Sequence, residues 1–470
     1  VQGLVIAASL EEAHRAMSRV VLVIPECIAA DSLVCLENGS VRRVDALFLN
    51  QVLAAGGLVS HRWTKAASVA LRISCGHQLT MGLMHQQPYI PKDTLRAKPF
   101  RGMGKEVAEA QVRIGFAKDL KLGDYLLVPD KLPHTVELHW TPDQLAFVGM
   151  ILADGNVSRK TKNSAQVRVE VKKDIDWFRT VFQAGLRAFG CSASYQEKTT
   201  DHGTVFWSNS LTLADILWGF GLRGGKKAST IDIAEQVFLS PLPSIAAFIG
   251  AFFACDGNVR ANGAVRFNST SSLFLRKLQL LLMKYGIHSN LIDWQGSKPR
   301  SARSYELNIY REDIQHFKSQ IPITMERKAT AIRPEGRRLS RRVTWKEGTF
   351  VLRPIRRIER VRAHYLWDIE TATGLFLANG VLTHNSWAFL PQQRGSPVKW
   401  AAQHIIRQGR ARGVYLWLDS QDVTSVDKNV LKSVDLWCLG RQREINEVRR
   451  ILDQLPATQK PRPSDVMTLG

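Results

Sequence analysis

Cysteine is scarce in this chain, and no pattern pairs the few that occur. The 470 residues include six cysteines, at positions 27, 35, 75, 191, 255 and 438. No two of them form the Cys-x-x-Cys spacing of structural zinc sites, and the spacing does not indicate a disulfide framework. A cysteine with a special role in this protein must therefore act through its own thiol.

Long apolar runs and a signal peptide are also lacking. No run reaches the roughly 20 residues that cross a bilayer. The first residues, Val1-Gln2-Gly3, do not lead into the basic region, apolar stretch and cleavage site of a secretory signal. We therefore expect a cytoplasmic protein without a membrane partner. Because residue 1 is not methionine and Gly470 follows a strand-like segment, we also expect the chain to be part of something longer.

Acidic residues are outnumbered by basic ones. The chain has 42 Asp and Glu against 64 Lys and Arg, which gives a formal net charge of +22. Such a charge predicts a polyanionic partner, most simply nucleic acid, because neutralising phosphates releases counterions. A role in solubility alone is the alternative. The length allows two to four domains, and 45% hydrophobic residues can form ordinary cores.

The most informative stretch that is present is Val381-Leu382-Thr383-His384-Asn385-Ser386. The side-chain amide of Asn385 can attack its own main-chain carbonyl, which closes a succinimide and breaks the bond to Ser386 without an outside nucleophile. His384 can assist as a general acid near neutral pH, and Ser386 supplies a hydroxyl nucleophile. Taken alone, the same tripeptide is more typical of a surface turn.

A matching nucleophile occurs far upstream, at Cys27. Residues 20–24 form a continuous apolar run suited to a buried parallel strand, and the pattern of apolar and polar residues changes after it. From Cys27 to about Asp130, short strands alternate with turn signals such as Glu37-Asn38-Gly39-Ser40. The pattern predicts a β-rich module that begins at Cys27.

A cysteine at the start of a β-rich module and His384-Asn385-Ser386 at its far end resemble an intein, a self-excising protein. The insert would be residues 27–385. The resemblance implies that Cys27 is the first nucleophile, that Ser386 is the second, and that Asn385 cyclises with help from His384. No cofactor is implied for splicing. His85 is similar to the internal histidine that activates the peptide bond before Cys27.

Two further features of the resemblance lie near the end of the insert. Asp368, within Leu366-Trp367-Asp368-Ile369-Glu370, is similar to the acidic residue that tunes the thiol and coordinates the two cuts. Phe376–Asn385 is similar to the closing strand pair of the family. Two positions depart from its usual pattern: Gly82 stands where a threonine is common, and Gly374 where a later histidine is common. These departures predict a slow first step or help from another donor.

Between these ends, the sequence contains an internal repeat. Leu145–Gly155 and Ala247–Gly257 are both apolar, contain small residues and end in Asp-Gly. The small residues, Gly149 and Gly250-Ala251, predict two closely packed helices, each ending in a left-handed glycine. Side-by-side helices would bring Asp154 and Asp256 together at one end. Such a carboxylate pair favours Mg²⁺, which can activate water and stabilise a phosphoryl leaving group.

The duplication resembles the single-chain, two-repeat LAGLIDADG homing endonucleases. We expect their αββαββα halves, with strands at 165–171, 205–213, 264–269 and 304–310 and helices near 177–189 and 273–285. The resemblance implies double-stranded DNA read in the major groove, with the host gene lacking the insert as target. It also implies one lysine in each half, for which Lys227 and Lys328 are the candidates. A degenerate scaffold that no longer cleaves is the alternative.

A basic stretch follows this repeat. Residues 333–362 contain eleven Arg or Lys against three Glu. The composition is equally compatible with a solvated linker that returns to the β-rich module and with an arm that contacts phosphate groups.

Joined directly, the flanks resemble a P-loop ATPase core of the HerA/FtsK type. Glu26 would be the Walker B glutamate, Gln421 the sensor residue and Arg410 a finger, whereas Pro25 replaces the usual aspartate. The chain contains no G-x-x-x-x-G-K-[ST] loop, so the Walker A half would lie upstream. The resemblance implies ATP and Mg²⁺ for the complete host. An unrelated α/β domain is the alternative.

The predicted organisation is multidomain. We expect α/β host flanks, an all-β Hint horseshoe formed from both ends of the insert, and a pseudo-twofold α+β LAGLIDADG domain in the middle. The predicted segments are residues 1–26, 27–138, 139–332, 333–385 and 386–470. We expect a monomeric insert and a homo-oligomeric host. The competing hypothesis is a DNA-binding or motor ATPase whose degenerate insertion never leaves.

Overall fold

The computed structural model describes most of the chain. The described residues are 21–23, 28–66, 69–83, 85–96, 106–107, 111–161, 163–222, 230–261, 263–294, 304–310, 312–333, 341–346, 348–362, 365–384, 416–418, 445–455 and 460–467. The chain divides into two compact units. The first contains Val1–Pro25 and Ser386–Gly470, and the second contains Glu26–Asn385.

The first unit combines segments from both ends of the chain. Strand β1 (Val21–Val23) pairs in parallel with β27 (Leu416–Leu418), so the parallel strand predicted in residues 20–24 is confirmed. Helices α13 (Ile445–Gln454) and α14 (Pro463–Met467) share a small core of Val448, Leu452, Leu455 and Val466. The helix predicted around Leu10–Met17 lies outside the described residues.

The second unit has a β-rich part and a central domain. We use "β-rich part" for the described residues of 28–133 and 341–384 and "central domain" for those of 134–333. The β-rich part contains β2 (Ile28–Ala29), β3 (Leu33–Cys35), β4 (Val41–Arg43), β5 (Val52–Leu53), β6 (Gly57–Ala66), β7 (Ala70–Ser74), β8 (Gln78–Met81), β9 (Gln86–Ile90), α2 (Lys92–Arg96), β10 (Glu106–Val107), β11 (Arg113–Phe116), β12 (Tyr125–Pro129), β21 (Arg342–Trp345), β22 (Gly348–Pro354), β23 (Arg357–Val361), β24 (Tyr365–Thr371), β25 (Leu375–Ala378) and β26 (Val381–His384).

Each sheet of the β-rich part combines strands from both of its segments. The strand orders are β10-β21-β22-β12-β9-β11, β23-β7-β8-β2-β24-β6-β5 and β26-β25-β3-β4. The predicted turn at Glu37–Ser40 joins β3 to β4, with Gly39 at φ +81°. Asn379 and Gly380, at φ 49° and 77°, form the tight turn between β25 and β26. The two segments of the β-rich part therefore form one folded body.

The basic stretch is largely built into this body. Where the structure describes them, residues 341–362 form strands β21 to β23, Arg353 is half-buried and donates to the Ser289 carbonyl at 3.1 Å, and Arg342 lies 3.1 Å from the carboxylate of Asp130. The solvated-linker prediction is therefore wrong for this part, because these residues are paired as strands with β12 and β7 of the β-rich part. Residues 334–340 lie outside the described residues.

The central domain contains two copies of one αββαββα arrangement, which confirms that prediction. The first copy is α3 (Pro142–Ala153), β13 (Gly155–Thr161), β14 (Ser164–Val171), α4 (Ile175–Ala188), β15 (Tyr195–Thr200), β16 (Gly203–Ser208) and α5 (Leu211–Gly219). The short α6 (Glu235–Phe238) follows it. The second copy is α7 (Leu242–Asp256), β17 (Asn258–Val259), β18 (Val265–Ser269), α8 (Ser272–Met283), β19 (Ser289–Trp294), β20 (Ser304–Ile309) and α9 (Glu312–Gln320), and α10 (Glu326–Ala331) ends the domain.

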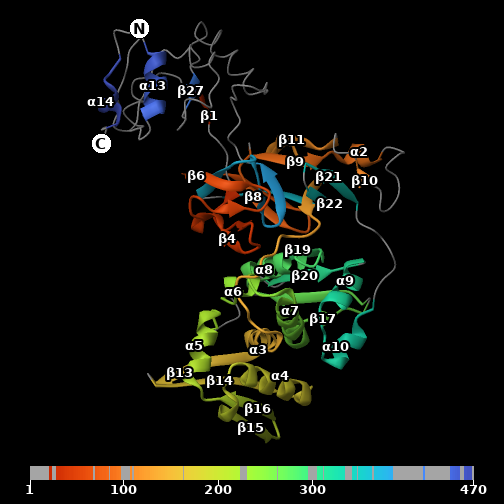
Figure 1. The fold of residues 1–470 in the computed structure, drawn as a ribbon. Helices are drawn as coiled ribbons and strands as arrows, with labels where there is room; N and C mark the ends of the chain where they lie inside the picture. The colour runs from red at the N-terminus through yellow and green to blue at the C-terminus, as the bar shows by residue number, and fades with distance from the viewer. Residues whose placement is uncertain are drawn as a thin grey trace. The chain divides into compact units, whose positions relative to one another are not determined.

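Each copy has one four-stranded antiparallel sheet, in the orders β13-β14-β16-β15 and β17-β18-β20-β19. Helices α3 and α7 pack side by side, as Figure 1 shows. The strand predicted to run to Leu213 is wrong beyond Ser208, because α5 begins at Leu211. Ser210 caps that helix by accepting a hydrogen bond from the Leu213 amide at 3.2 Å. This cap outweighs the alternation of apolar and polar residues that predicted a strand.

The glycines of the repeat have other roles than those predicted. A Cβ on Gly149 would lie 2.5 Å from the Phe248 carbonyl oxygen, so this glycine does allow α3 to approach α7. Gly250 instead makes room for the Pro322 carbonyl. The left-handed caps are wrong: Gly257 has φ −69°, and Gly155 is not among the residues with positive φ. Both glycines are needed because a side chain would collide with the preceding helical turn.

One hydrophobic core runs through the whole second unit. It includes Ile28 and Leu382 of the β-rich part together with Phe147, Phe252 and Leu281 of the central domain. The central domain is therefore not a loosely tethered insertion. Within the part of the chain that the structure describes, no helix is long and apolar enough to span a bilayer.

Gly149→Ala should test the helix contact. The added methyl group would lie against the Phe248 carbonyl, and overpacking of this kind costs about 2 kcal/mol. We expect a lower denaturant midpoint for the unfolding of the second unit. The control is Gly219→Ala at the end of α5, where the nearest atom to the new methyl group is 3.8 Å away. A Gly149→Ala midpoint equal to that of the control would contradict the close approach.

Candidate functional site

The two ends of the second unit are the first candidate site. Strand β2 begins directly after Cys27, and β26 ends at His384, directly before Asn385. Cys27, Glu26, Asn385 and Ser386 themselves lie outside the described residues. The geometry of this site is therefore given by the residues that adjoin them in the strands.

A buried hydrogen bond joins the predicted internal histidine to the last strand. Nε2 of His85 lies 2.5 Å from Oγ1 of Thr383, and both side chains are fully buried. The main chain also holds His85, since its amide donates to the Gly82 carbonyl at 3.2 Å and its carbonyl accepts from Ala117 at 2.8 Å. This bond links residues 298 positions apart. It places His85 against Thr383, the residue that precedes His384.

The closing hairpin is held by several other polar contacts. Nε2 of Gln87 donates to the Leu382 carbonyl at 2.5 Å. The Asn379 side chain accepts from the Leu33 amide at 2.8 Å and donates to the Gln78 carbonyl at 2.7 Å. The hairpin that carries His384 is thus attached to strand β3 and to the start of β8.

His77 supports the turn of the same hairpin. Its Nδ1 is hydrogen-bonded to the Asn379 carbonyl at 2.9 Å, and the side chain is fully buried. Burial, with a further contribution from the Arg353 guanidinium, lowers the pKa of His77 to about 3. His77 is therefore neutral at physiological pH, and its role is to position the turn.

Asp368 lies on the strand that holds β2. Its neighbour Trp367 is paired with Ile28 in the antiparallel β2–β24 ladder, and Asp368 itself is opposite Trp63 of β6. Asp368 is therefore next in β24 to Trp367, and the strand partner of Trp367 is Ile28, which directly follows Cys27. The sequence interpretation did not identify Thr383, Gln87 or Asn379 as functional, although the Asn379-Gly380 pair is a recognisable turn signal.

The ends of the two packed helices are the second candidate site. Asp154 follows α3, Asp256 is the last residue of α7, and both are exposed. Burial raises the pKa of the Cys255 thiol well above its usual value, and the carboxylates of Asp154 and Asp256 raise it further. Both carboxylates therefore act on one thiol at this end of the packed helices.

Lys328 of α10 adjoins these carboxylates. Its ammonium donates to the Gly257 carbonyl and lies 5.7 Å from the centre of the Phe253 ring. Burial lowers the pKa of Lys328, Arg327 lowers it further, and Cys255, Asp256 and Asp154 oppose the shift. The first-half candidate, Lys227, lies outside the described residues.

The carboxylate pair fits the divalent ion that the repeat predicts. Among the described side chains, no cluster of three or more His, Cys, Asp and Glu could hold a metal. Mg²⁺ does not need such a cluster, because it keeps several waters and binds through one or two carboxylates plus substrate phosphates. Asp154 and Asp256 supply two such carboxylates at an exposed position. Cys255, kept as a neutral thiol by its raised pKa, is not suited to bind Mg²⁺.

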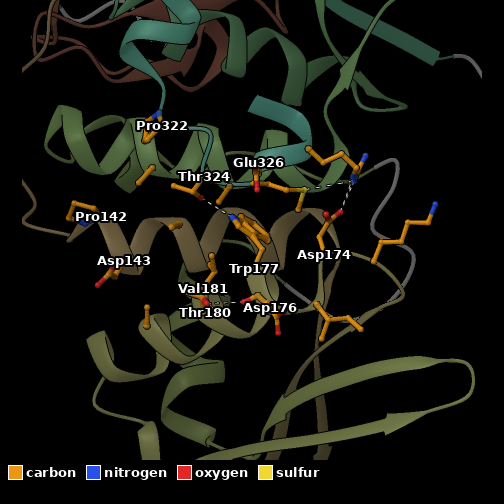
Figure 2. Close-up of a pocket in the computed structure, with 18 of the residues that line it drawn as sticks. Pro142, Asp143, Asp174, Asp176, Trp177, Thr180, Val181, Pro322, Thr324 and Glu326 are labelled. Carbon is orange, nitrogen blue, oxygen red and sulfur yellow. Dashed lines mark hydrogen bonds and ion pairs between the residues drawn. The ribbon is translucent and has the colours of Figure 1, made fainter. Parts of the chain in front are cut away.

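A groove of about 1170 Å³ lies on the central domain between α3, α4, α7 and α10. Figure 2 shows Trp177 in this groove, with its indole nitrogen donating to the Thr324 hydroxyl at 2.8 Å. Arg327 binds the Asp174 carboxylate at 2.7 Å beside it. These contacts join the two halves of the domain. The lining includes Pro142 and Asp143 at the start of α3 and also Arg327 and Thr330, which flank Lys328, so the groove runs along the packed helices.

Thr383→Val should test the buried link between His85 and the last strand. Valine keeps the shape of threonine but leaves Nε2 of His85 without this partner, which costs about 1 kcal/mol or more. We expect a lower denaturant midpoint for the second unit. Thr373→Val, which removes hydrogen bonds in an exposed turn, should lower the midpoint less. A Thr383→Val midpoint equal to that of the wild type would show that the His85 contact contributes nothing.

The chain is similar to short segments of proteins with diverse names. It is 25% identical over 207 residues to a probable translation initiation factor IF-2 of Thermococcus kodakarensis, covering 42% of this chain and 16% of that protein. It is 23% identical over 338 residues to a DNA polymerase of Thermococcus hydrothermalis, covering 68% and 20%. With the replicative DNA helicase DnaB of Rhodothermus marinus, identity is 24% and coverage 46% and 24%. The chain thus spans a quarter or less of these relatives.

Solved structures give weaker likenesses. A crystal structure of I-DmoI in complex with DNA and calcium has 16% identity and a TM-score of 0.32, covering 40% of this chain and 96% of that one. The homing endonuclease I-WcaI bound to its DNA recognition sequence has 11% identity and a TM-score of 0.28, covering 42% and 89%. Residues 243–322 match the family described as LAGLIDADG-like domain. The chain therefore contains a LAGLIDADG-like domain.

Proposed function

We propose that residues 27–385 are a self-splicing intein that carries a homing endonuclease. The observation that carries the proposal is the division of the chain. The compact unit Glu26–Asn385 ends at the predicted downstream splice junction and begins one residue before Cys27. The remaining segments, from the two ends of the chain, form the other unit, and β1 pairs with β27 across the insertion. A removable insert in a continuous host has this organisation.

The diverse names of the relatives support the same proposal. An initiation factor, a polymerase and a helicase have no common activity, yet each is similar to this chain over a quarter or less of its length. Similarity over such small parts of proteins with unrelated names is not expected to follow from their named activities. An element inserted into unrelated hosts explains the pattern.

The proposed splicing begins at the upstream junction. The Cys27 thiol attacks the Glu26 carbonyl, so the peptide bond is replaced by a thioester and Cys27 gains a free amine. His85 polarises this bond or protonates the departing nitrogen. The Ser386 hydroxyl then attacks the thioester, which releases the Cys27 thiol and leaves Glu26 attached to Ser386 through an ester.

The second half of the reaction frees the insert. The side-chain nitrogen of Asn385 attacks its own main-chain carbonyl while His384 donates a proton to the leaving amine of Ser386. The insert leaves with a succinimide at its end. The new amine of Ser386 then attacks the adjacent ester and forms an ordinary peptide bond between Glu26 and Ser386. Buried contacts at Thr383 and Leu382 support the position of the strand that ends at His384.

The central domain is proposed to cleave double-stranded DNA, with the host gene lacking the insert as its target. Asp154 and Asp256 would hold Mg²⁺, which supplies charge stabilisation at phosphate and an activated water when bound. Lys328, beside Gly257, would place its positive charge next to the developing phosphate charge. Net charge of +22 supports a DNA partner.

The host is proposed to be a HerA/FtsK-type ATPase. Val23 is paired with Leu418 in the parallel β1–β27 ladder. Parallel strands are typical of α/β domains, so this pairing supports an α/β host. The competing proposal is a DNA-binding or motor protein that keeps a degenerate insertion.

Splicing is tested by removing both junction nucleophiles. Cys27→Ala with Asn385→Ala should leave only full-length precursor on a gel, because neither the thioester nor the succinimide can form. Cys255→Ala is the control, since this thiol lies in the central domain, and it should splice as wild type does. Ligated product in the double variant would contradict the mechanism.

DNA cleavage is tested at the carboxylate pair. Asp256→Asn should lower Mg²⁺-dependent cleavage of the uninterrupted host gene by about a hundredfold or more, since a catalytic metal supplies several kcal/mol. Chelation of Mg²⁺ should have the same effect on the wild type. Asp143→Asn, at the opposite end of α3 from Asp154, is the matched control and should cleave normally. Absence of wild-type cleavage under broad conditions would favour the degenerate scaffold.

A further inference from the structure

Helix α8 of the central domain contacts both ends of the β-rich part. Gln279 of α8 donates to the Gly76 carbonyl at 3.0 Å, immediately before His77, which supports the closing hairpin. A Cβ on Gly380, in the turn of that hairpin, would lie 3.0 Å from the side chains of Leu280 and Met283. The same helix reaches the beginning of the insert through Arg276.

Arg276 forms a two-point clamp on Asp31. One guanidinium nitrogen donates to the Asp31 carbonyl at 3.0 Å, and the other donates to its carboxylate at 2.9 Å. The Arg276 side chain is only 10% exposed, whereas that of Asp31 is 59% exposed. Hydrogen bonds from a charged donor are about twice as strong as neutral ones, and the bond to the Asp31 main chain is made from the buried Arg276 side chain.

The clamp acts on the turn that follows a short strand, which is itself paired with β8 and β24. Strand β2 has only two residues, Ile28 and Ala29, and it follows Cys27 directly. A turn at Ala30 and Asp31 follows, closed by the Ser32 amide donating to the Ala29 carbonyl at 2.9 Å. A strand of two residues makes few backbone hydrogen bonds of its own. The direction of β2 therefore also depends on the contacts of the turn that follows it.

We propose that Arg276 is a positioning residue for the Cys27 end of the splicing centre, and that the central domain is thereby a working part of the splicing unit. The inference rests on the proposed splicing function. Formation of the thioester needs the Cys27 thiol aligned with the Glu26 carbonyl, and small displacements of reacting groups are costly. Loss of the clamp loosens the segment that orients Cys27. Cyclisation of Asn385 depends instead on the hairpin that carries His384.

The neighbouring residue offers a matched control. Lys277 of α8 also binds one carboxylate and one carbonyl, but these belong to Asp232 and Ile233, both at 2.8 Å. These partners are in the central domain itself. The two residues therefore make the same kind of contact from the same helix, and only the contact of Arg276 reaches the β-rich part.

The experiment measures the two junctions separately in the full chain. In an Asn385→Ala background, dithiothreitol releases the upstream segment only when the Cys27 thioester forms. In a Cys27→Ala background, release of the downstream segment reports cyclisation of Asn385. We expect Arg276→Ala to slow thiol-induced cleavage about tenfold and to leave Asn385 cyclisation unchanged. Lys277→Ala should change neither rate, and Arg276→Lys should restore part of the first.

Each outcome decides the proposal. Equal slowing at both junctions would reduce Arg276 to general structural support, and equal rates for the Arg276 and Lys277 variants would also overturn the inference while splicing itself stands. If Arg276→Ala does not fold, Asp31→Ala carries the same expectation, because it removes the carboxylate from the other side of the contact. No thiol-induced cleavage in the Asn385→Ala background alone would instead overturn the proposed function, and this inference with it.

Discussion

The structure of the second unit depends on the attachment of its last hairpin to its first strands. Asn379 makes this attachment, since its side chain accepts from Leu33 and donates to Gln78 while its own amide donates to the Leu33 carbonyl at 2.7 Å. A segment near the end of the second unit thereby becomes part of a sheet formed near its beginning. The loop-closure entropy of such distant contacts is large, and the buried core of the unit offsets it.

The same constraint makes the central domain part of the fold. A single core extends from Ile28 to Leu382 through the packed helices α3 and α7. Deleting such a domain would expose apolar surface and would leave polar groups such as Arg353, which binds the Ser289 carbonyl at 3.1 Å, without partners. The DNA-binding element and the splicing element that we propose are therefore energetically coupled, whatever the history of the insertion.

The sequence predicted the helices of the repeat because apolar residues and terminal Asp-Gly pairs are strong local signals. It did not predict β13 or β15, since segments such as Tyr195–Thr200 are mostly polar and are defined by backbone pairing with their neighbours. The prediction of left-handed glycines was wrong for a related reason. Glycine is required at position 257 because a side chain there would collide with Phe253, and not because the helix ends in a left-handed cap. The Thr383 contact with His85 spans almost the whole insert, and no local pattern announces it.

The splicing that we propose makes a peptide bond that the encoded chain does not contain. Trypsin should cut after Arg19 and after Arg394. Mass spectrometry of the purified wild-type product should therefore find one peptide in which Val20–Glu26 is joined directly to Ser386–Arg394. Detection of that peptide would establish that the Glu26–Cys27 and Asn385–Ser386 bonds are replaced by one bond between Glu26 and Ser386. Its absence from soluble protein that remains intact at 52.8 kDa would contradict the account.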